Sequence, residues 1–410
     1  MNKKLKLTRC SIRENWSLFL CGFFIMMTWL DNLPKLDELT QYNEFQLILN
    51  YSIGFIPRGF IGTLLLPIKY FTAKHFAIIF AVITLFFVVV YVSFCVWLLR
   101  GSLERKVSEY WILLMTFLPM TVANVFDVAH YGNTDILMIS ILLINAWLLT
   151  TRKRGGIIIS TILVTIGMLI HSVYSFLFFA GTFNLLLWLS WKTKKKSYIV
   201  AAALDTVIVI SLLFYFNSGR PLLFMPFENI EAYILGRTSE NMDYAITFIP
   251  LWFSSSLDVI RDSYKQSLFY FTLDEAAILY LLLLPVITWI FVFWRRCYKR
   301  FGSPKVFWIF ALSLISVLPC HRYMTDHGRW MAGPFWSQLV LLFSVLNYKD
   351  SDGEREIFTE LFSEKTETYR FGLLLYLLIL GPVGIITVNK PVHRIWLAVR
   401  TVFSKVIGAF

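Results

Sequence analysis

The sequence predicts an all-α protein, a polytopic bundle of about eleven transmembrane helices with a large outer loop. Three observations lead to this fold class. First, 57% of the 410 residues are hydrophobic and only 16% are charged, whereas ordinary soluble domains carry about 25% charged residues. Second, the apolar residues form separate runs of about 15–25 residues, the length that crosses a bilayer core. Third, short clusters of Lys and Arg stand between the runs.

Each apolar run is an expected span. In chain order, the runs lie at 16–30, 75–99, 110–126, 134–151, 156–170, 173–191, 198–216, 276–294, 306–320, 331–347 and 371–388. The first resembles a signal peptide, but no small-residue cleavage pattern follows it, so we expect an uncleaved helix. Residues 156–191 are divided into two short spans that meet near His171, because the basic clusters on both sides should lie on one side of the membrane.

The Lys/Arg clusters set the orientation. They contain 24 of the 38 Lys and Arg residues and lie at 3–13, 100–106, 152–154, 192–196, 295–305 and 349–370. Alternating spans place all six on the same side, which the positive-inside rule makes cytoplasmic, with the N-terminus. Eleven spans leave the basic tail 389–410 outside, where we expect an interfacial helix.

We expect one integral membrane domain over residues 1–410. Within it, 217–275 is predicted to be an extracytoplasmic loop folded onto the membrane surface, because it mixes charged and aromatic stretches. The segment 32–74 is predicted to be an outer amphipathic or re-entrant segment, since Gly and Pro interrupt its apolar residues. Irregular backbone at that depth must be covered by protein or line a wet cavity.

The composition also excludes several classes of protein. The net charge of +12 comes from residues that mark one face of a bilayer, so we do not expect a nucleic-acid binder. The five cysteines show no CxxC pairing and indicate neither a disulfide framework nor a zinc site. No metal or cofactor is therefore expected.

Apart from the acidic run at 350–367, the polar residues that could carry chemistry gather on the outer side. The charged residues there are Asp31, Arg58, Asp127, Asp135, Arg220, Arg237, Glu240, Asp243, Asp258, Arg261, Arg322, Asp326 and Arg329. An active site, if present, should therefore face outward.

A short loop between two predicted spans forms the tightest polar cluster. The turn at Gly132-Asn133 brings Asp127, His130 and Asp135 into one small volume. Asp135 would begin a helix, where its charge complements the helix dipole. The alternative is a plain capped turn, with Asn133 or Thr134 as N-cap.

A second cluster lies between the predicted ninth and tenth spans. Its residues are His321, Arg322, Asp326, His327, Arg329 and Trp330. The arginines suit phosphate oxygens, and Trp330 offers a face to a sugar ring. The alternative is an interfacial loop with aromatic and basic anchors. A metal site from the histidines and Asp326 lacks any recognised ligand spacing.

Three further residues deserve notice. Arg58 is a cation inside an apolar outer segment, so it needs an anionic partner, which is either a bound substrate or a lipid headgroup. Neighbouring glycines at 59 and 62 would let a ligand or helix approach closely. His171 is either a catalyst or a helix-end histidine. Asp205 lies within a span, where a carboxylate is a functional candidate.

This pattern of about 400 residues, ten to twelve spans, a large late outer loop and outward Arg and carboxylate residues resembles the bacterial O-antigen or capsule repeat-unit polymerases, the Wzy-like proteins. More loosely it is similar to the GT-C membrane glycosyltransferases, which place an acidic residue where this chain has Asp31. The resemblance implies a location in the bacterial cytoplasmic (inner) membrane. It implies as partners a polyprenyl-diphosphate-linked oligosaccharide, membrane lipid and a chain-length regulator.

The resemblance also implies a mechanism. Arg58, Arg322 and Arg329 would hold the diphosphate of the donor. Asp127, Asp31 or a histidine such as His171 would take the proton of the acceptor hydroxyl. Two other classes stay open: a lipid-linked glycan flippase or transporter, and a membrane acyltransferase with His171 or His130 as base. Neither nucleotide nor metal is required, because the activated donor already contains its leaving group.

Overall fold

The protein is described by a computed structural model over residues 40–105, 134–151, 155–247, 249–250, 273–302 and 327–362, together with residues 310, 313 and 317. This part is mostly helical, which confirms the all-α fold class. The predicted spans 16–30, 110–126 and 371–388 lie outside the described residues, as does most of 306–320. The number of spans therefore stays a prediction.

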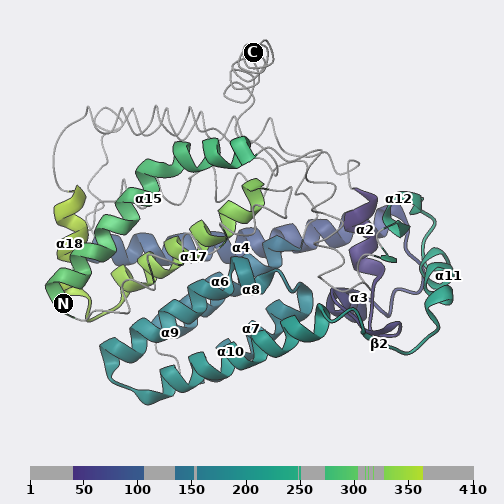
Figure 1. The fold of residues 1–410 in the computed structure, drawn as a ribbon, viewed down its shortest axis with the longest axis horizontal. Helices are drawn as coiled ribbons and strands as arrows, with labels where there is room; N and C mark the ends of the chain where they lie inside the picture. Colours follow the sequence, from purple (N-terminus) through teal and green to yellow (C-terminus); the bar gives the residue numbers. More distant parts are fainter. Residues whose placement is uncertain are drawn as a thin grey trace, which may run out of the picture.

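Long helices that run side by side form the body of the molecule (Figure 1). They are α4 (Ala73–Arg105), α6 (Asp135–Thr150), α7 (Gly156–Ile170), α9 (Phe179–Thr193), α10 (Lys196–Phe216), α15 (Leu273–Phe301) and α17 (His327–Asn347). Each begins and ends near a predicted apolar run, and α7 has the predicted bounds. The reason is local, since a long apolar run between polar clusters satisfies its own backbone best as a helix.

Two described helices, Ala73–Leu98 within α4 and Lys196–Phe216, are long and apolar enough to cross a membrane. Both carry a stripe of exposed large aliphatic residues. On α10 the stripe consists of Ile199, Val200, Leu204, Val207 and Ile210, and it ends with the aromatic Phe214. Soluble monomers rarely expose so continuous an apolar surface, so these stripes fit contact with lipid.

One predicted span is divided in two. Residues 173–191 form a short helix α8 (Tyr174–Leu177) and then α9, with the break at Phe178. The Ser337 hydroxyl of α17 donates to the Leu177 carbonyl at 2.8 Å, and so satisfies backbone close to the break. A Cβ on Gly333 would lie 2.5 Å from the Leu177 side chain, so α17 packs directly against α8.

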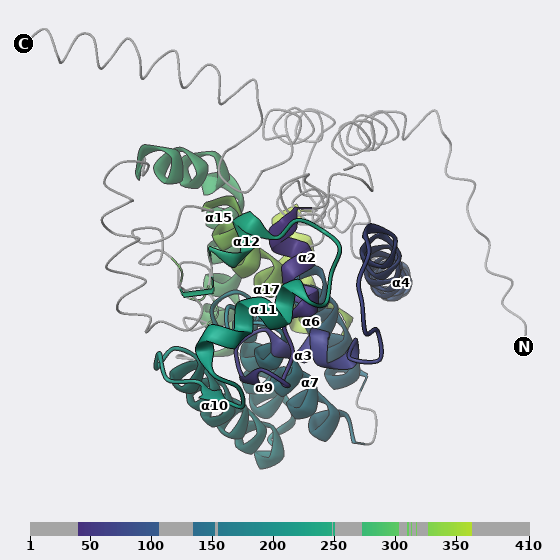
Figure 2. The same ribbon diagram turned by 90° about the vertical axis from the view of Figure 1, so that its right-hand side faces the viewer.

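A small cap covers one end of these helices (Figures 1 and 2). We define the cap as residues 40–72 and 217–247. Its elements are α2 (Gln41–Ile48), β1 (Gly54–Phe55), α3 (Gly59–Leu64), β2 (Leu222–Leu223), η2 (Phe227–Asn229), α11 (Ile230–Leu235) and α12 (Asp243–Ile246). Both segments contribute to one apolar core, which includes Phe45, Phe71 and Ile234.

Backbone hydrogen bonds join the two segments of the cap. β1 and β2 pair antiparallel, with Gly54 opposite Leu223. The Phe71 N–H donates to the Arg237 carbonyl at 2.7 Å, and the Ser239 N–H donates back to the Phe71 carbonyl at 3.1 Å. The predicted outer segments 32–74 and 217–275 therefore meet, as far as they are described, in one folded unit.

The glycines beside Arg58 serve the packing of the cap rather than a ligand. A Cβ on Gly62 would lie 1.9 Å from the Leu49 carbonyl oxygen, and one on Gly59 would lie 2.6 Å from the Tyr51 ring. Because the chain's own backbone and an aromatic ring fill this space, the prediction of an open approach for a ligand at these glycines is wrong. The close helix contact is confirmed.

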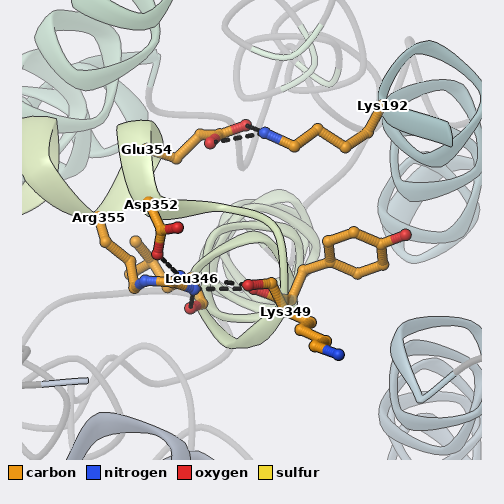
Figure 3. Close-up of polar contacts among 7 residues, drawn as sticks. Lys192, Leu346, Lys349, Asp352, Glu354 and Arg355 are labelled. Atoms are coloured by element: carbon orange, nitrogen blue, oxygen red, sulfur yellow. Dashed lines mark hydrogen bonds and ion pairs between the residues drawn. The ribbon is translucent and has the colours of Figure 1, made fainter.

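The opposite end, which we call the basic end, contains α18 (Asp352–Phe362) and the Lys/Arg-rich ends of α9 and α15 (Figure 1). Lys192 of α9 forms an ion pair with Glu354 of α18 at 3.0 Å (Figure 3). Arg300 of α15 forms another with Glu356 of α18. These contacts bring the basic segments 192–196, 295–301 and 349–355 together, away from the cap.

The described part of the acidic run at 350–367, residues 350–362, is not a freely solvated segment. Ser351, Glu354 and Phe358 are buried, and α18 packs on α15. Arg355 of α18 donates to the carbonyls of Leu346 and Tyr348 at 3.2 and 2.8 Å, and to the Asp352 carboxylate (Figure 3). Residues 352–362 thus form an amphipathic helix docked on the basic end.

Candidate functional site

Half of the predicted site residues lie outside the described part of the chain: Asp31, Asp127, His130, His321, Arg322 and Asp326. His327 and Arg329 lie in the first turn of α17, where their side chains are also outside the description. The structure describes Arg58, Asp135, His171 and Trp330. These four lie on neighbouring elements at the cap end of the helices.

Arg58 has an unusual backbone conformation. Its φ of 65° and ψ of 6° lie in the left-handed region, between the end of β1 and the start of α3. The Gly59 N–H donates to the Ile56 carbonyl at 3.4 Å, which closes a turn with Pro57 and Arg58 at its centre. This geometry is that of a type II turn, whose third position normally holds Gly. An Arg held there costs free energy, and such strain often marks a functional position.

The Arg58 side chain is directed to α2. Its guanidinium donates to the Tyr42 hydroxyl and lies 5.5 Å from the centre of the Tyr42 ring. Both side chains are only partly buried. The turn and this contact hold the guanidinium in a defined position against α2.

Asp135 is the first residue of α6 and is 8% exposed. Thr134 occupies the N-cap position, but its side chain does not cap the helix. Instead, the Thr134 hydroxyl donates to the Gln46 side-chain carbonyl of α2 at 3.5 Å. From the sequence, Thr134 was a candidate side-chain cap of a plain turn. In the structure its side chain instead ties the start of α6 to the cap formed by residues 40–72 and 217–247.

His171 lies at the predicted tip, in the turn between α7 and α8. It is the C-cap of α7, is 3% exposed, and its Nδ1 accepts from the Val173 N–H at 3.1 Å. A neutral imidazole that accepts at Nδ1 carries its proton on Nε2. It cannot take a second proton at Nδ1 without losing this turn contact. The geometry favours the helix-end reading of His171 over the catalytic one.

Trp330 does not present an open face. It is 3% exposed, and its ring lies 5.9 Å from the Phe176 ring of α8. This contact positions the start of α17 beside the His171 turn. The structure therefore gives Trp330 a packing role in place of the sugar platform that we expected.

The structure adds one acid that the sequence analysis missed. Glu44 of α2 is 9% exposed, and within the described part of the chain its carboxylate has no cation or hydrogen-bond partner. Burial, and secondly the negative charge of Glu240, raise the pKa of Glu44 to about 7. Glu240 itself accepts from the Ala73 N–H at 2.9 Å, at the start of α4, where the helix dipole favours a negative charge. A carboxyl group with such a pKa is suited to proton transfer.

α2 connects these groups. Tyr42 and Gln46 are one turn apart and share a face, so they reach Arg58 and Thr134 respectively, whereas Glu44 leaves α2 on the other side. The signal in the sequence is that amides and a carboxylate interrupt a short apolar stretch, Gln41 to Asn50. Asn43, Gln46 and Asn50 are all buried. Such polar side chains need specific partners.

Arg237, which the sequence analysis counted among the outward charges, stabilises the cap. Its guanidinium donates to the Ile68 carbonyl at 2.5 Å and lies 5.3 Å from the centre of the Phe71 ring. It also reaches the Tyr233 hydroxyl, which is hydrogen-bonded to Asn50. Arg237 is 7% exposed and is thus part of the cap's interior.

Among the described residues, no group of three or more His, Cys, Asp or Glu side chains is arranged to hold a metal ion. In comparisons with known proteins, no family model, no curated protein and no solved structure matches the chain. The chemistry must therefore be argued from the cap end itself. That end offers a fixed arginine, an acid with a pKa near 7 and a buried aspartate at a helix start.

Proposed function

We propose that the protein is an integral membrane glycosyltransferase of the polysaccharide-polymerase type, which acts on a polyprenyl-diphosphate-linked glycan at the outer face of the bacterial cytoplasmic membrane. The observation that carries the proposal is the difference between the two ends of the helices. The polar groups suited to chemistry gather at the cap, and the Lys/Arg-rich segments gather at the other end, which the positive-inside rule makes cytoplasmic.

In the proposed reaction, an acceptor sugar hydroxyl attacks the anomeric carbon of the donor glycan. The bond from that carbon to the diphosphate oxygen breaks, and polyprenyl diphosphate leaves with the bonding electrons. A base takes the hydroxyl proton. Arg58 stabilises the charge that develops on the diphosphate, because its guanidinium is fixed at the cap's edge.

The base is a carboxylate. Among the described residues, Glu44 suits this role best, because a base with a pKa near the working pH transfers protons most effectively. Glu44 and Arg58 lie on different sides of α2, but a helix is only about 10 Å across. A lipid diphosphate that carries several sugars is longer than this and can contact both. Asp127 and Asp31 are the alternatives if Glu44 is not the base.

A flippase for lipid-linked glycan is the second candidate. The observation that favours it is Asp205, which is fully buried near the middle of α10. A flippase should line a path through the membrane with polar groups, and Asp205 lies between the two ends. The clustering of the other candidates at the cap favours an enzyme.

The test is deletion of this chain in its source cells, followed by analysis of surface polysaccharide. Loss of a polymerase leaves single repeat units on the surface and collapses the ladder of chain lengths. Loss of a flippase removes the surface glycan and leaves lipid-linked units inside the cell. An unchanged polysaccharide would contradict both candidates. Complementation with the intact chain should restore the ladder.

A further inference from the structure

A cluster of polar side chains lies buried between the helices α6 to α10. Asp205 of α10 and Tyr174 of α8 are both 0% exposed, as is Asn145 of α6. Ser160 of α7 and Thr182 of α9 are almost as deeply buried. α10 packs on α7, α8 and α9, and α6 packs on α7 and α9. On the opposite face of α10, apolar side chains such as Leu204 and Val207 are exposed, so the polar face points inward.

Within the described part of the chain, several oxygen atoms of this cluster lack hydrogen-bond partners. They are both carboxylate oxygens of Asp205, the Tyr174 hydroxyl, the Asn145 side-chain carbonyl oxygen and the Ser160 hydroxyl. Asn145 uses its amide nitrogen to donate to the Thr182 hydroxyl at 3.5 Å. A buried carboxylate without a partner costs several kcal/mol. A bound cation that accepts lone pairs from these oxygen atoms would offset this cost.

Among the described residues, the helices packed against Asp205 provide no cation to it. From α7, the Thr161 hydroxyl approaches the carboxylate, and from α8 the Tyr174 phenol lies within range of its charge. Tyr174 in turn approaches Thr182 of α9 and Asn145 of α6. α7 and α8 contain no Lys, Arg or His, and the one Lys of α9, Lys192, is paired with Glu354 at the basic end.

We propose that Asp205, Asn145, Tyr174 and the neighbouring hydroxyls form a buried binding site for Na⁺. The ligand chemistry points to a hard monovalent cation, because all the candidate ligands are oxygen atoms and only one of them is charged. A divalent ion normally takes more carboxylates. A proton would neutralise Asp205 but would leave the Asn145 oxygen and one carboxylate oxygen unmet. The site does not depend on whether the chain transfers sugars.

The test uses the full-length protein in detergent micelles and follows its melting temperature by intrinsic fluorescence. Na⁺ is raised at constant ionic strength by replacing choline, and the series is run at pH 6 and pH 8. A ligand that binds only the folded state stabilises it further with each increase in concentration. We expect a rise of about 1.5–2 °C for each tenfold increase in Na⁺ above the dissociation constant.

The Asp205→Asn variant keeps the shape and removes the charge, so its melting temperature should not respond to Na⁺. Asp243→Asn, at an exposed acid of the cap, is the matched control and should respond like the unaltered protein. If Asp205→Asn does not fold, Tyr174→Phe removes one ligand and should weaken the Na⁺ response several-fold. Equal responses in all variants, or a response to pH alone that depends on Asp205, would overturn the Na⁺ site.

Discussion

The cap and the basic end both bury charged side chains, but they treat them differently. At the basic end, Glu354 is fully buried and forms an ion pair with Lys192, whose ammonium also lies 5.6–6.0 Å from the ring centres of Trp188, Trp191 and Phe301. In the cap, Glu44 is also buried, yet no described cation pairs with it. The paired charges fix the helices in place. Glu44, which has no partner among the described residues, is available for chemistry.

The cap and the basic end also differ in where a non-glycine residue adopts a positive φ. Lys194, the non-glycine residue with positive φ at the basic end, is the C-cap of α9, where a left-handed residue commonly ends a helix. Arg58 has a similar φ but lies before a helix, in a turn position that favours Gly. The first conformation has an ordinary structural reason. The second carries a strain that a role in binding would explain.

The largest effect should come from the unpaired acid. Glu44→Gln keeps the size of the side chain but removes the basic oxygen, so we expect product formation to fall by about 100-fold or more. The measurement is elongation of lipid-linked repeat units by purified protein, with the units extracted from the deletion strain. Glu231→Gln, at an exposed acid of α11 in the same cap, is the control and should retain activity. Normal elongation by Glu44→Gln would move the search for the base to Asp127 and Asp31.

The same variant should show a distinct effect on stability. An unfolded glutamate ionises near pH 4.5, whereas folded Glu44 does so near pH 7. Folding therefore loses up to about 3 kcal/mol of stability as pH rises from about 4.5 to 7. Glu44→Gln removes this loss, so at pH 8 it should resist urea better than the unaltered protein. Lower stability of the variant at pH 8 would contradict the burial of an unpaired acid.

At the basic end, loss of the buried acid should lower the stability of the protein and leave its activity unchanged. Glu354→Gln leaves Lys192 without its counter-charge and should destabilise the protein by about 3 kcal/mol, while activity per folded molecule stays unchanged. Urea unfolding and the elongation assay measure the two quantities. Glu356→Gln removes a pair between exposed side chains and should cost less than about 1 kcal/mol. A loss of activity at full stability in Glu354→Gln would remove the contrast between the two ends.

The smallest change in stability should come from Arg58. Arg58→Gly relieves the left-handed strain and should stabilise the fold by about 1 kcal/mol or leave it unchanged, yet elongation should be largely lost. Arg58→Lys keeps the charge without the guanidinium fork, so activity should be reduced. If Arg58 only anchored a lipid headgroup, the Arg58→Lys variant would keep nearly full activity, because Lys would bind the headgroup nearly as well. Full activity of both variants would exclude Arg58 from the site.

The helices could be predicted closely from the sequence, because each is coded by a local apolar run between polar clusters. α7 lies at 156–170 as predicted, and α10 begins two residues before the predicted 198. The break at Phe178 was missed, because the apolar composition of 173–191 is the same on both sides of it. It depends on contacts with α17, which is distant in sequence.

The candidate site was less predictable for the same reason. The cap joins residues far apart in the chain, such as Asn50 and Tyr233, which are 183 positions apart, and no local pattern indicates such pairing. Arg58 could be identified, since an arginine in an apolar segment is costly wherever it lies. Glu44 could not, because its unusual pKa comes from burial in the cap and from Glu240. The docking of α18 was not predicted, because composition alone does not show that the apolar residues of this helix share one face.

The central claim is that an acid in the cap, with a pKa near 7, removes the acceptor proton. The most direct test is the pH dependence of elongation by the purified full-length protein at saturating lipid-linked donor. Because the carboxylate form is the active one, the rate should fall about tenfold for each pH unit below pH 7 and level off above it. A rate that stays constant from pH 5.5 to 8.5, or that falls only near pH 4.5, would contradict the claim.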